Sequence, residues 1–183
     1  LAVLDRSKEP GAGGEPLLLD VQSALYDSNL RPSVIGGRYG LGSKDTTPDQ
    51  IIAVFDELRR LKSEQKSRFT IGIHDDVTHL SLPTQGRIDL TEKETYQAKF
   101  WGFGSDGTVG ANKASIKLIG EKTNQFVQGY FYYDSKKSGG LTVSHLRFGE
   151  KPIRSAYLID HADFIACHTP AYIHSYDVLK GLK

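Results

Sequence analysis

The chain has 183 residues, and its 23 lysines and arginines against 22 aspartates and glutamates give a formal net charge of +1. This balance gives no electrostatic reason to expect nucleic acid or a charged membrane surface as a partner. The sequence contains no apolar run of the roughly 18 residues that cross a bilayer, so no membrane span is predicted. Hydrophobic residues make up 38% of the chain, enough for one sizeable core or two small ones.

Cysteine and methionine usage is unusual. Cys167 is the only cysteine, and there is no methionine. A single cysteine excludes an internal disulfide and cannot by itself hold a metal or an iron–sulfur cluster, so we expect a reducing, cytoplasmic setting. Because the chain lacks an initiator methionine and opens directly on an apolar run, we expect it to be a piece of a longer protein.

The first half of the chain predicts alternating strands and helices. A short strand at 1–4 is followed by a proline- and glycine-rich loop, and residues 17–26 carry apolar side chains at helical spacing. A second strand centred on 33–35 is expected to end at Gly36-Gly37. This order is typical of a parallel-sheet α/β domain.

A second helix is predicted from its start signals. Thr47 suits the N-cap, Pro48 the first helical position, and the apolar face runs to Leu61. Residues 69–82 alternate and are rich in β-branched side chains, which favours extended structure. We place the domain boundary near the polar connector 83–95.

The second half predicts a strand, a glycine-rich turn and a helix, followed mainly by strands. Apolar and alternating runs predict strands at 98–103, 126–133, 141–148, 156–159 and 164–167, a helix at 108–120 that stops at Gly120, and a final helix opened by Thr169-Pro170.

Glycines concentrate in the turn between the first of these strands and its helix. Gly102, Gly104 and Gly107 form a G-x-G-x-x-G pattern, and Gly110 follows. Glycines let the backbone approach a ligand closely, while the helix behind them presents free N–H groups and a partial positive charge. Such a turn suits a phosphate, although many strand–helix turns carry glycines for packing alone.

A lysine pair follows the next predicted strand. Lys136 and Lys137 stand just after Tyr133-Asp134, where a dinucleotide-binding unit meets the ribose of its ligand. Basic residues there favour a phosphorylated ribose, as in NADP or coenzyme A. A solvated lysine pair on a turn is the alternative reading.

The histidines predict neither a metal site nor a catalytic group. His74 and His79 lie five residues apart, which in an extended segment places them on opposite faces and does not match helical zinc pairs. His145, His161 and His168 are scattered through the sequence without an evident nucleophile or carboxylate partner. We therefore predict no catalytic residue and no metal ligand in this chain.

Several long runs together resemble one family. The runs DRSKEPGAGGEPLLLDV, VIGGRYGLGSKDTTPDQIIAVFDEL, FTIGIHDDVTHLSLP, FWGFGSDGTVGANKASIKLIG and YFYYDSKKSGGLTVSHLRFGEKPIRSAYLIDHADFIACH resemble the middle of pyruvate:ferredoxin (flavodoxin) oxidoreductases. The resemblance implies an α/β fold in two partial domains. Residues 1–92 would end domain II, which is similar to the transketolase C-terminal domain, and residues 93–183 would begin the Rossmann-like domain III, or gamma domain.

The resemblance also implies a function. These enzymes oxidatively decarboxylate pyruvate on thiamine diphosphate with Mg²⁺, pass electrons through [4Fe-4S] clusters to ferredoxin or flavodoxin, and transfer the acetyl group to coenzyme A. The family implies a homodimer, in the cytoplasm or in an organelle such as the hydrogenosome. The resemblance assigns coenzyme A binding to domain III, and the matching residues here are Gly104, Ser105, Asp106, Gly107, Thr108 and Lys136.

The residues alone are also compatible with two other functions. The region could be a structural and interface module in which the glycines serve strand–helix packing only. It could also be an NADP-binding Rossmann domain, although no catalytic Tyr-Lys set follows the glycine turn.

Overall fold

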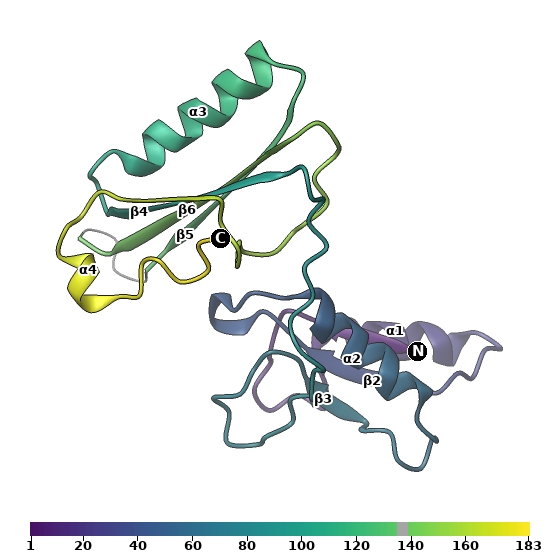
Figure 1. The fold of residues 1–183 in the computed structure, drawn as a ribbon. Coiled ribbons are helices and arrows are strands. Elements are labelled where there is room, and N and C mark those ends of the chain that lie inside the picture. The colour runs from purple at the N-terminus through teal and green to yellow at the C-terminus, as the bar shows by residue number, and fades with distance from the viewer. Residues whose placement is uncertain (135–138) are drawn as a thin grey trace. The chain divides into compact units, whose positions relative to one another are not determined.

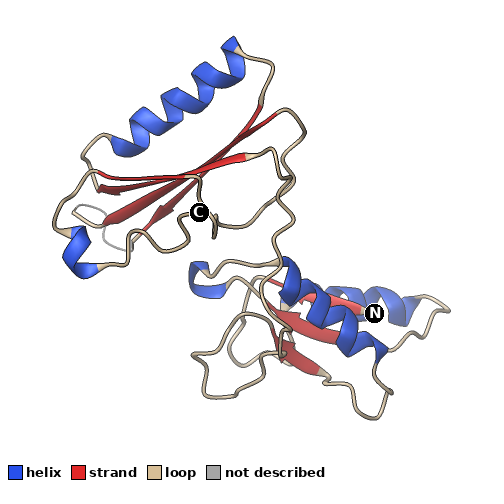
Figure 2. Ribbon diagram, viewed as in Figure 1, coloured by secondary structure: helices blue, strands red, loops and turns tan. Residues whose placement is uncertain are grey.

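A computed structural model describes residues 1–134 and 139–183. The chain divides into two compact units, Leu1–Asp89 and Leu90–Lys183, each with its own sheet. The strands and helices of each unit can be followed in Figures 1 and 2. Because both units combine a sheet with helices, the predicted α/β class is confirmed. Among the described residues, no helix is both long enough and apolar enough to cross a membrane.

The first unit is built on a three-stranded parallel sheet in which β2 lies between β1 and β3. Its elements are β1 (Ala2–Asp5), α1 (Pro16–Asp27), β2 (Ile35–Arg38), a 3-10 turn (Leu41–Ser43), α2 (Pro48–Arg59) and β3 (Arg68–Thr70). Pro16 and Pro48 each open a helix, where the missing N–H group costs no hydrogen bond. Both predicted helices are therefore confirmed.

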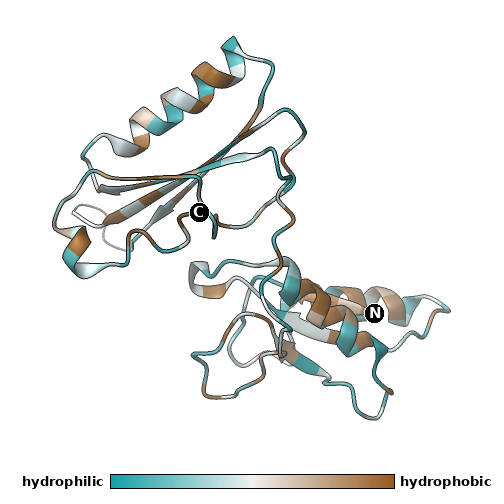
Figure 3. Cartoon of the chain, viewed as in Figure 1, coloured by the Kyte–Doolittle hydropathy of each residue, from teal (hydrophilic) through white to brown (hydrophobic). Residues whose placement is uncertain are grey.

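The two helices of this unit pack on opposite faces of the sheet. Leu18 of α1 lies over Gly36, where an added Cβ would be 2.4 Å from Leu18 Cδ2. On the other face, Ile35 shares a buried cluster with Ala53 and Val54 of α2. Successive strand residues point to opposite faces, so the neighbours Ile35 and Gly36 face different helices. Figure 3 shows the apolar residues of both helices in brown.

The prediction that a strand ends at Gly36-Gly37 is wrong, because β2 runs through both glycines. Neighbouring side chains fill the space that the glycines leave: an added Cβ at Gly37 would be 2.3 Å from Phe69 Cε2. Because the glycines have no side chains, the large side chains of Leu18 and Phe69 can pack directly against the strand.

The extended segment predicted at 69–82 is a strand only as far as Thr70. Beyond β3 the backbone turns through left-handed conformations at Gly72 (φ 65°) and His79 (φ 50°). It returns to the sheet through a single bridge between Thr70 and Ser81. The apolar alternation reflects burial of Ile71, Ile73 and Leu82 in a loop rather than a continuous strand.

The second unit is a four-stranded mixed sheet in the order β5–β6–β4–β7. Its elements are β4 (Tyr96–Phe103), α3 (Thr108–Lys122), β5 (Phe126–Tyr133), β6 (Leu141–Gly149), β7 (Phe164–Cys167) and α4 (Tyr172–Ser175). Helix α3 lies along one face of the sheet (Figure 1). The helix continues for two residues past Gly120, so the predicted glycine stop is wrong.

Strand β6 distinguishes this sheet from an all-parallel Rossmann sheet. It is antiparallel to both neighbours, β4 and β5, whereas β7 is parallel to β4. Strands β4 and β5 therefore run in the same direction with β6 inserted between them. The carboxyl ends of β4, β5 and β7 and the start of β6 share one edge of the sheet.

Near the end of the chain, the predicted strand at 156–159 is wrong, and the predicted final helix is present but short. Residues 156–159 form no strand, although Tyr157 and Ile159 are buried, because Ile159 donates its N–H to the His145 ring at 3.1 Å rather than to a neighbouring strand. The final helix is only the four-residue α4, after which the chain turns and its end bridges back to Ala162.

A buried polar row occupies the sheet face opposite α3. Gln97 and Lys99 on β4 lie across from Arg147 and His145 on β6. Arg147 Nε donates to Gln97 Oε1 at 3.0 Å, and Lys99 Nζ donates to the carbonyl of Lys180 at 2.8 Å. Burial, the largest cause, lowers the pKa of Lys99 below its ordinary value.

Candidate functional site

The glycine turn lies between the end of β4 and the start of α3, as predicted. Gly107 is the N-cap of α3 and adopts a left-handed conformation with φ 90°. Ser105 is also left-handed, with φ 77°. A side chain at such a φ is strained, so the turn itself requires glycine at 107 and tolerates Ser105 at a cost.

Gly102 and Gly104 are required by close approach. A Cβ at Gly102 would lie 2.7 Å from Cβ and Oγ1 of Thr108, the first residue of α3. A Cβ at Gly104 would lie 3.2–3.3 Å from backbone atoms of Gly139 and Gly140. The first glycine thus lets α3 begin directly over the strand, and the second lets the turn meet the β5–β6 connection.

The turn is joined to this connection by the main chain. Gly104 donates its N–H to the carbonyl of Gly140 at 2.8 Å, and Asp134 donates to Leu141 O at 2.9 Å. A cavity of about 240 Å³ lies at this edge of the sheet. It is lined by Phe103, Gly104, Ser105, Asp106, Gly107, Val109, Gly110, Tyr133, Gly140, Leu141 and Thr142.

Four of the six predicted site residues line this cavity, and Thr108 is buried directly behind them. The sixth, Lys136, lies outside the described residues. The chain positions flanking 135–138 are described, and Tyr133 and Gly140 both line the cavity.

Only part of the backbone in the turn is available to a ligand. Gly104, Asp106 and Thr108 donate their N–H groups within the protein, the last to Asp106 Oδ1 at 2.7 Å. Among the described residues, N–H groups without an acceptor belong to Ser105, Gly107, Val109 and Gly110. An anion in the cavity would meet these groups rather than all five amides of residues 104–108.

Asp106 organises the turn. Its Oδ2 accepts the N–H of Phe103 at 2.8 Å and its Oδ1 accepts that of Thr108. Burial pushes the pKa of Asp106 upward, but these hydrogen bonds, one from the Thr108 hydroxyl and the charge of His168 lower it below its ordinary value overall. The carboxylate therefore caps α3 and holds the turn closed.

Replacing Asp106 by asparagine is expected to destabilise the fold by about 1 kcal/mol, because the single amide oxygen can replace only one of the two carboxylate oxygens that accept the N–H groups of Phe103 and Thr108. Chemical denaturation at pH 7 measures the change. Below the pKa of Asp106 the wild-type carboxyl is protonated and loses the same interaction, so the difference between the two proteins should shrink in acid. A constant difference would show that the charge does not matter.

His168 also belongs to this site, although the sequence did not indicate that it would. Its ring atom Nδ1 lies 2.8 Å from Oγ1 of Thr108, and its backbone N–H donates to the carbonyl of Trp101 at 2.9 Å. The contact arises because β7 runs parallel beside β4, so both strands end at the same edge. The predicted strand at 164–167 was the available signal, but the sequence does not give its position in the sheet.

Thr142 is a second residue that sequence reasoning missed. It is 5% exposed, lines the cavity, and its hydroxyl has no hydrogen-bond partner among the described residues. A buried hydroxyl without a partner is costly, and a ligand atom would satisfy it. Thr142 lies directly across from Gly102 on β4, on the face that α3 covers.

Comparison with known proteins gives a consistent result. Residues 97–183 match the family model described as pyruvate ferredoxin/flavodoxin oxidoreductase. Over 100% of its length the chain is 58% identical to the pyruvate:ferredoxin oxidoreductase of Moorella thermoacetica and 58% identical to the pyruvate-flavodoxin oxidoreductase of Enterobacter agglomerans. It is also 54% identical to the probable pyruvate-flavodoxin oxidoreductase of Escherichia coli.

These relatives are much longer than the chain, which spans 16% of the length of each. Among solved structures, the chain is similar to the pyruvate oxidoreductase subunit PORC of Thermotoga maritima, with a TM-score of 0.38 and 18% identity. That match covers 50% of this chain and 46% of the other.

Proposed function

We propose that this chain is a segment of a pyruvate ferredoxin/flavodoxin oxidoreductase, the family whose model matches residues 97–183, and that it supplies the coenzyme A-binding segment of the enzyme. On this proposal residues 1–92 end domain II and residues 93–183 begin domain III. The bound group is a phosphate-bearing part of the coenzyme, and the site is the cavity beside the glycine turn.

The observation that carries the proposal is the set of donors around that cavity. The N–H groups of Ser105, Gly107, Val109 and Gly110 have no acceptor among the described residues, and the hydroxyl of Thr142 has no hydrogen-bond partner among them. Unpaired donors at a helix N-terminus suit a phosphate. A volume of about 240 Å³ suits one phosphate-bearing portion and not a whole coenzyme.

Each residue then has a physical task. Ser105 and Gly107 donate to phosphate oxygens, while Asp106 holds the turn and Thr108 fixes the first turn of α3 on His168. Lys136, which stands between Tyr133 and Gly140 in the sequence, neutralises a phosphate. The coenzyme supplies the thiol that accepts an acyl group, and this chain binds and orients it.

The activity of the longer enzyme is part of the proposal. It oxidises pyruvate with thiamine diphosphate and Mg²⁺, passes electrons to ferredoxin or flavodoxin, and acts as a homodimer. A [4Fe-4S] cluster takes four cysteine thiolates, so we assign the clusters to other parts of the enzyme, because this chain has one cysteine. The free thiol of Cys167 supports a reducing compartment, the cytoplasm or an organelle.

Replacing Lys136 by alanine in the complete enzyme is expected to raise the KM for coenzyme A roughly 5- to 150-fold, as a charge-assisted contact of about 1–3 kcal/mol is lost. The KM for pyruvate should stay unchanged. Steady-state kinetics with each substrate varied in turn measures both. Lys117→Ala is the matched control, because Lys117 is an exposed lysine on α3 whose ion pair with Glu121 is a surface one. An unchanged coenzyme dependence in Lys136→Ala would remove this lysine from the site.

Calorimetric titration separates the proposal from its alternatives. Binding of coenzyme A and not of NADPH supports the proposed function. Binding of NADPH would support the Rossmann alternative. If neither binds, the turn serves packing, and the region is a structural module.

A further inference from the structure

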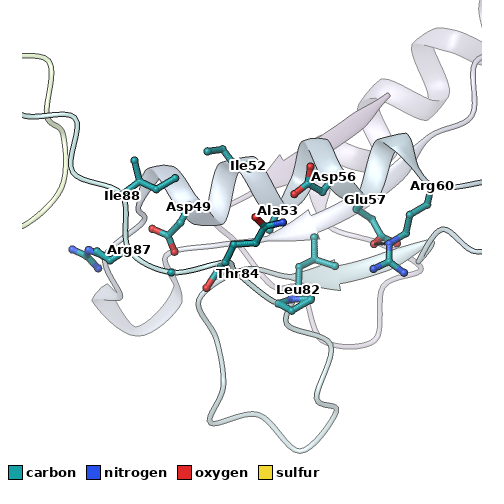
Figure 4. A pocket seen from close by; sticks show the side chains of 13 residues that line it. Asp49, Ile52, Ala53, Asp56, Glu57, Arg60, Leu82, Thr84, Arg87 and Ile88 are labelled. Atoms are coloured by element: carbon teal, nitrogen blue, oxygen red, sulfur yellow. Dashed lines mark ion pairs between the residues drawn. The ribbon is translucent and has the colours of Figure 1, made fainter.

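A second cavity lies within the first unit. It has a volume of about 470 Å³ and lies between α2 and the segment that follows Ser81. Its lining residues are Asp49, Ile52, Ala53, Asp56, Glu57, Arg60, Leu82, Pro83, Thr84, Gln85, Gly86, Arg87 and Ile88 (Figure 4).

One end of this cavity holds a fully partnered carboxylate. Glu57 is 2% exposed, and its Oε2 pairs with Arg60 Nε at 3.1 Å. Its Oε1 accepts the backbone N–H of Lys66 at 2.5 Å. Figure 4 shows Glu57 and Arg60 side by side. Both oxygens are satisfied, as a buried charge requires.

The other end holds a carboxylate that lacks such a partner. Asp49 lies on the same helix and is 8% exposed, yet its Oδ1 has no hydrogen-bond partner among the described residues. Figure 4 shows its carboxylate directed from α2 into the cavity, toward the segment with Thr84 and Arg87. Arg87 does not serve as its counterion, because the guanidinium of Arg87 pairs with Asp45 at 3.4 Å.

The walls between the two ends define the ligand further. Ile52, Ala53, Leu82, Pro83 and Ile88 give the cavity apolar walls. Such walls accept an aliphatic stem while a charged end reaches the carboxylate. Among the described residues, no group of three or more His, Cys, Asp or Glu could hold a metal ion.

We propose that this cavity binds an organic cation, a guanidinium or ammonium group on a short aliphatic stem, with Asp49 as its counterion. Asp49 would then have the kind of partner that Glu57 already has in Arg60. The ligand's stem would lie on Ile52 and Leu82. The site is independent of the glycine turn and of the function proposed for it.

Titration of the isotopically labelled full chain with propylguanidinium tests the proposal by two-dimensional NMR. We expect saturable shifts of backbone amides confined to residues 49–60 and 82–88. Asp49→Asn should weaken this binding at least tenfold. Propylurea, the neutral analogue, should cause no such shifts. A titration with propylammonium shows whether an ammonium group binds as a guanidinium group does.

A second measurement distinguishes a binding role from a structural one. Without ligand, Asp49→Asn should raise the midpoint of thermal unfolding, because it removes a buried charge that has no partner. A structural Asp49 that only complements the helix N-terminus would give the opposite sign. Asp20→Asn, an exposed carboxylate on α1, is the matched control and should change neither the midpoint nor the binding. Equal binding by wild type and Asp49→Asn, or the same shifts with Mg²⁺, would overturn the proposal.

Discussion

Replacing Gly102 by alanine is expected to destabilise the protein by about 2 kcal/mol, the usual cost of forcing extra atoms into a packed site. The added Cβ would lie 2.7 Å from Cβ and Oγ1 of Thr108 and 2.9 Å from its Cγ2. Thr108 cannot move aside, because its hydroxyl is bonded to His168 and its carbonyl accepts from Asn112. Chemical denaturation measures the loss, and calorimetry of coenzyme A binding to the complete enzyme should show weaker binding, because the start of α3 is displaced.

Gly110→Ala is the matched control for the stability effect. Gly110 lies in α3, and an added Cβ would meet no atom within 4 Å. Alanine inside a helix is favoured over glycine by roughly 0.5–1 kcal/mol, so this variant should be slightly more stable than wild type. If the two variants changed stability by the same amount, close packing at Gly102 would not be the reason for a glycine there.

Acid is expected to destabilise the protein through His145, by up to about 4 kcal/mol. Burial, with smaller contributions from the charges of Lys99 and Arg147, lowers the pKa of His145 from 6.5 to about 3. Between these two values the unfolded chain binds a proton at His145 that the folded chain does not. The free energy of unfolding should therefore fall as the pH drops from about 6.5 toward 3.

The variant His145→Gln isolates this effect. Glutamine keeps an oxygen that can accept the N–H of Ile159 but does not titrate, so the pH dependence of unfolding should be shallower over this range. His174→Gln, at an exposed position, should keep the wild-type slope. Denaturation curves at half-unit pH intervals measure both slopes. Identical slopes for wild type and His145→Gln would contradict the assignment.

The sequence predicted well those elements whose signals are local. The strand before the glycine turn, the start of α3 at Thr108 and the strand at 126–133 all follow from apolar periodicity and from glycine placement. The close approach at Gly102 has the same origin, because a strand that turns at once into a helix leaves no room for a side chain.

Features set by long-range pairing could not be predicted in this way. Which strand lies beside β4 depends on the whole sheet, so neither the insertion of β6 nor the approach of His168 to Thr108 could be read from the sequence. For the same reason the sequence could not show that residues 156–159 are buried without forming a strand. A loop that covers a sheet is as apolar as a strand within it.

The antiparallel insertion of β6 has a consequence for how the proposed coenzyme site opens. Because Gly104 donates its N–H to Gly140, a hydrogen bond joins the glycine turn to the residue just before β6, and we expect the two segments to open together. The rate at which the Gly104 amide exchanges with deuterated solvent therefore reports the opening of both segments together. A ligand that bridges them would slow this exchange, and one that binds only elsewhere would leave it unchanged.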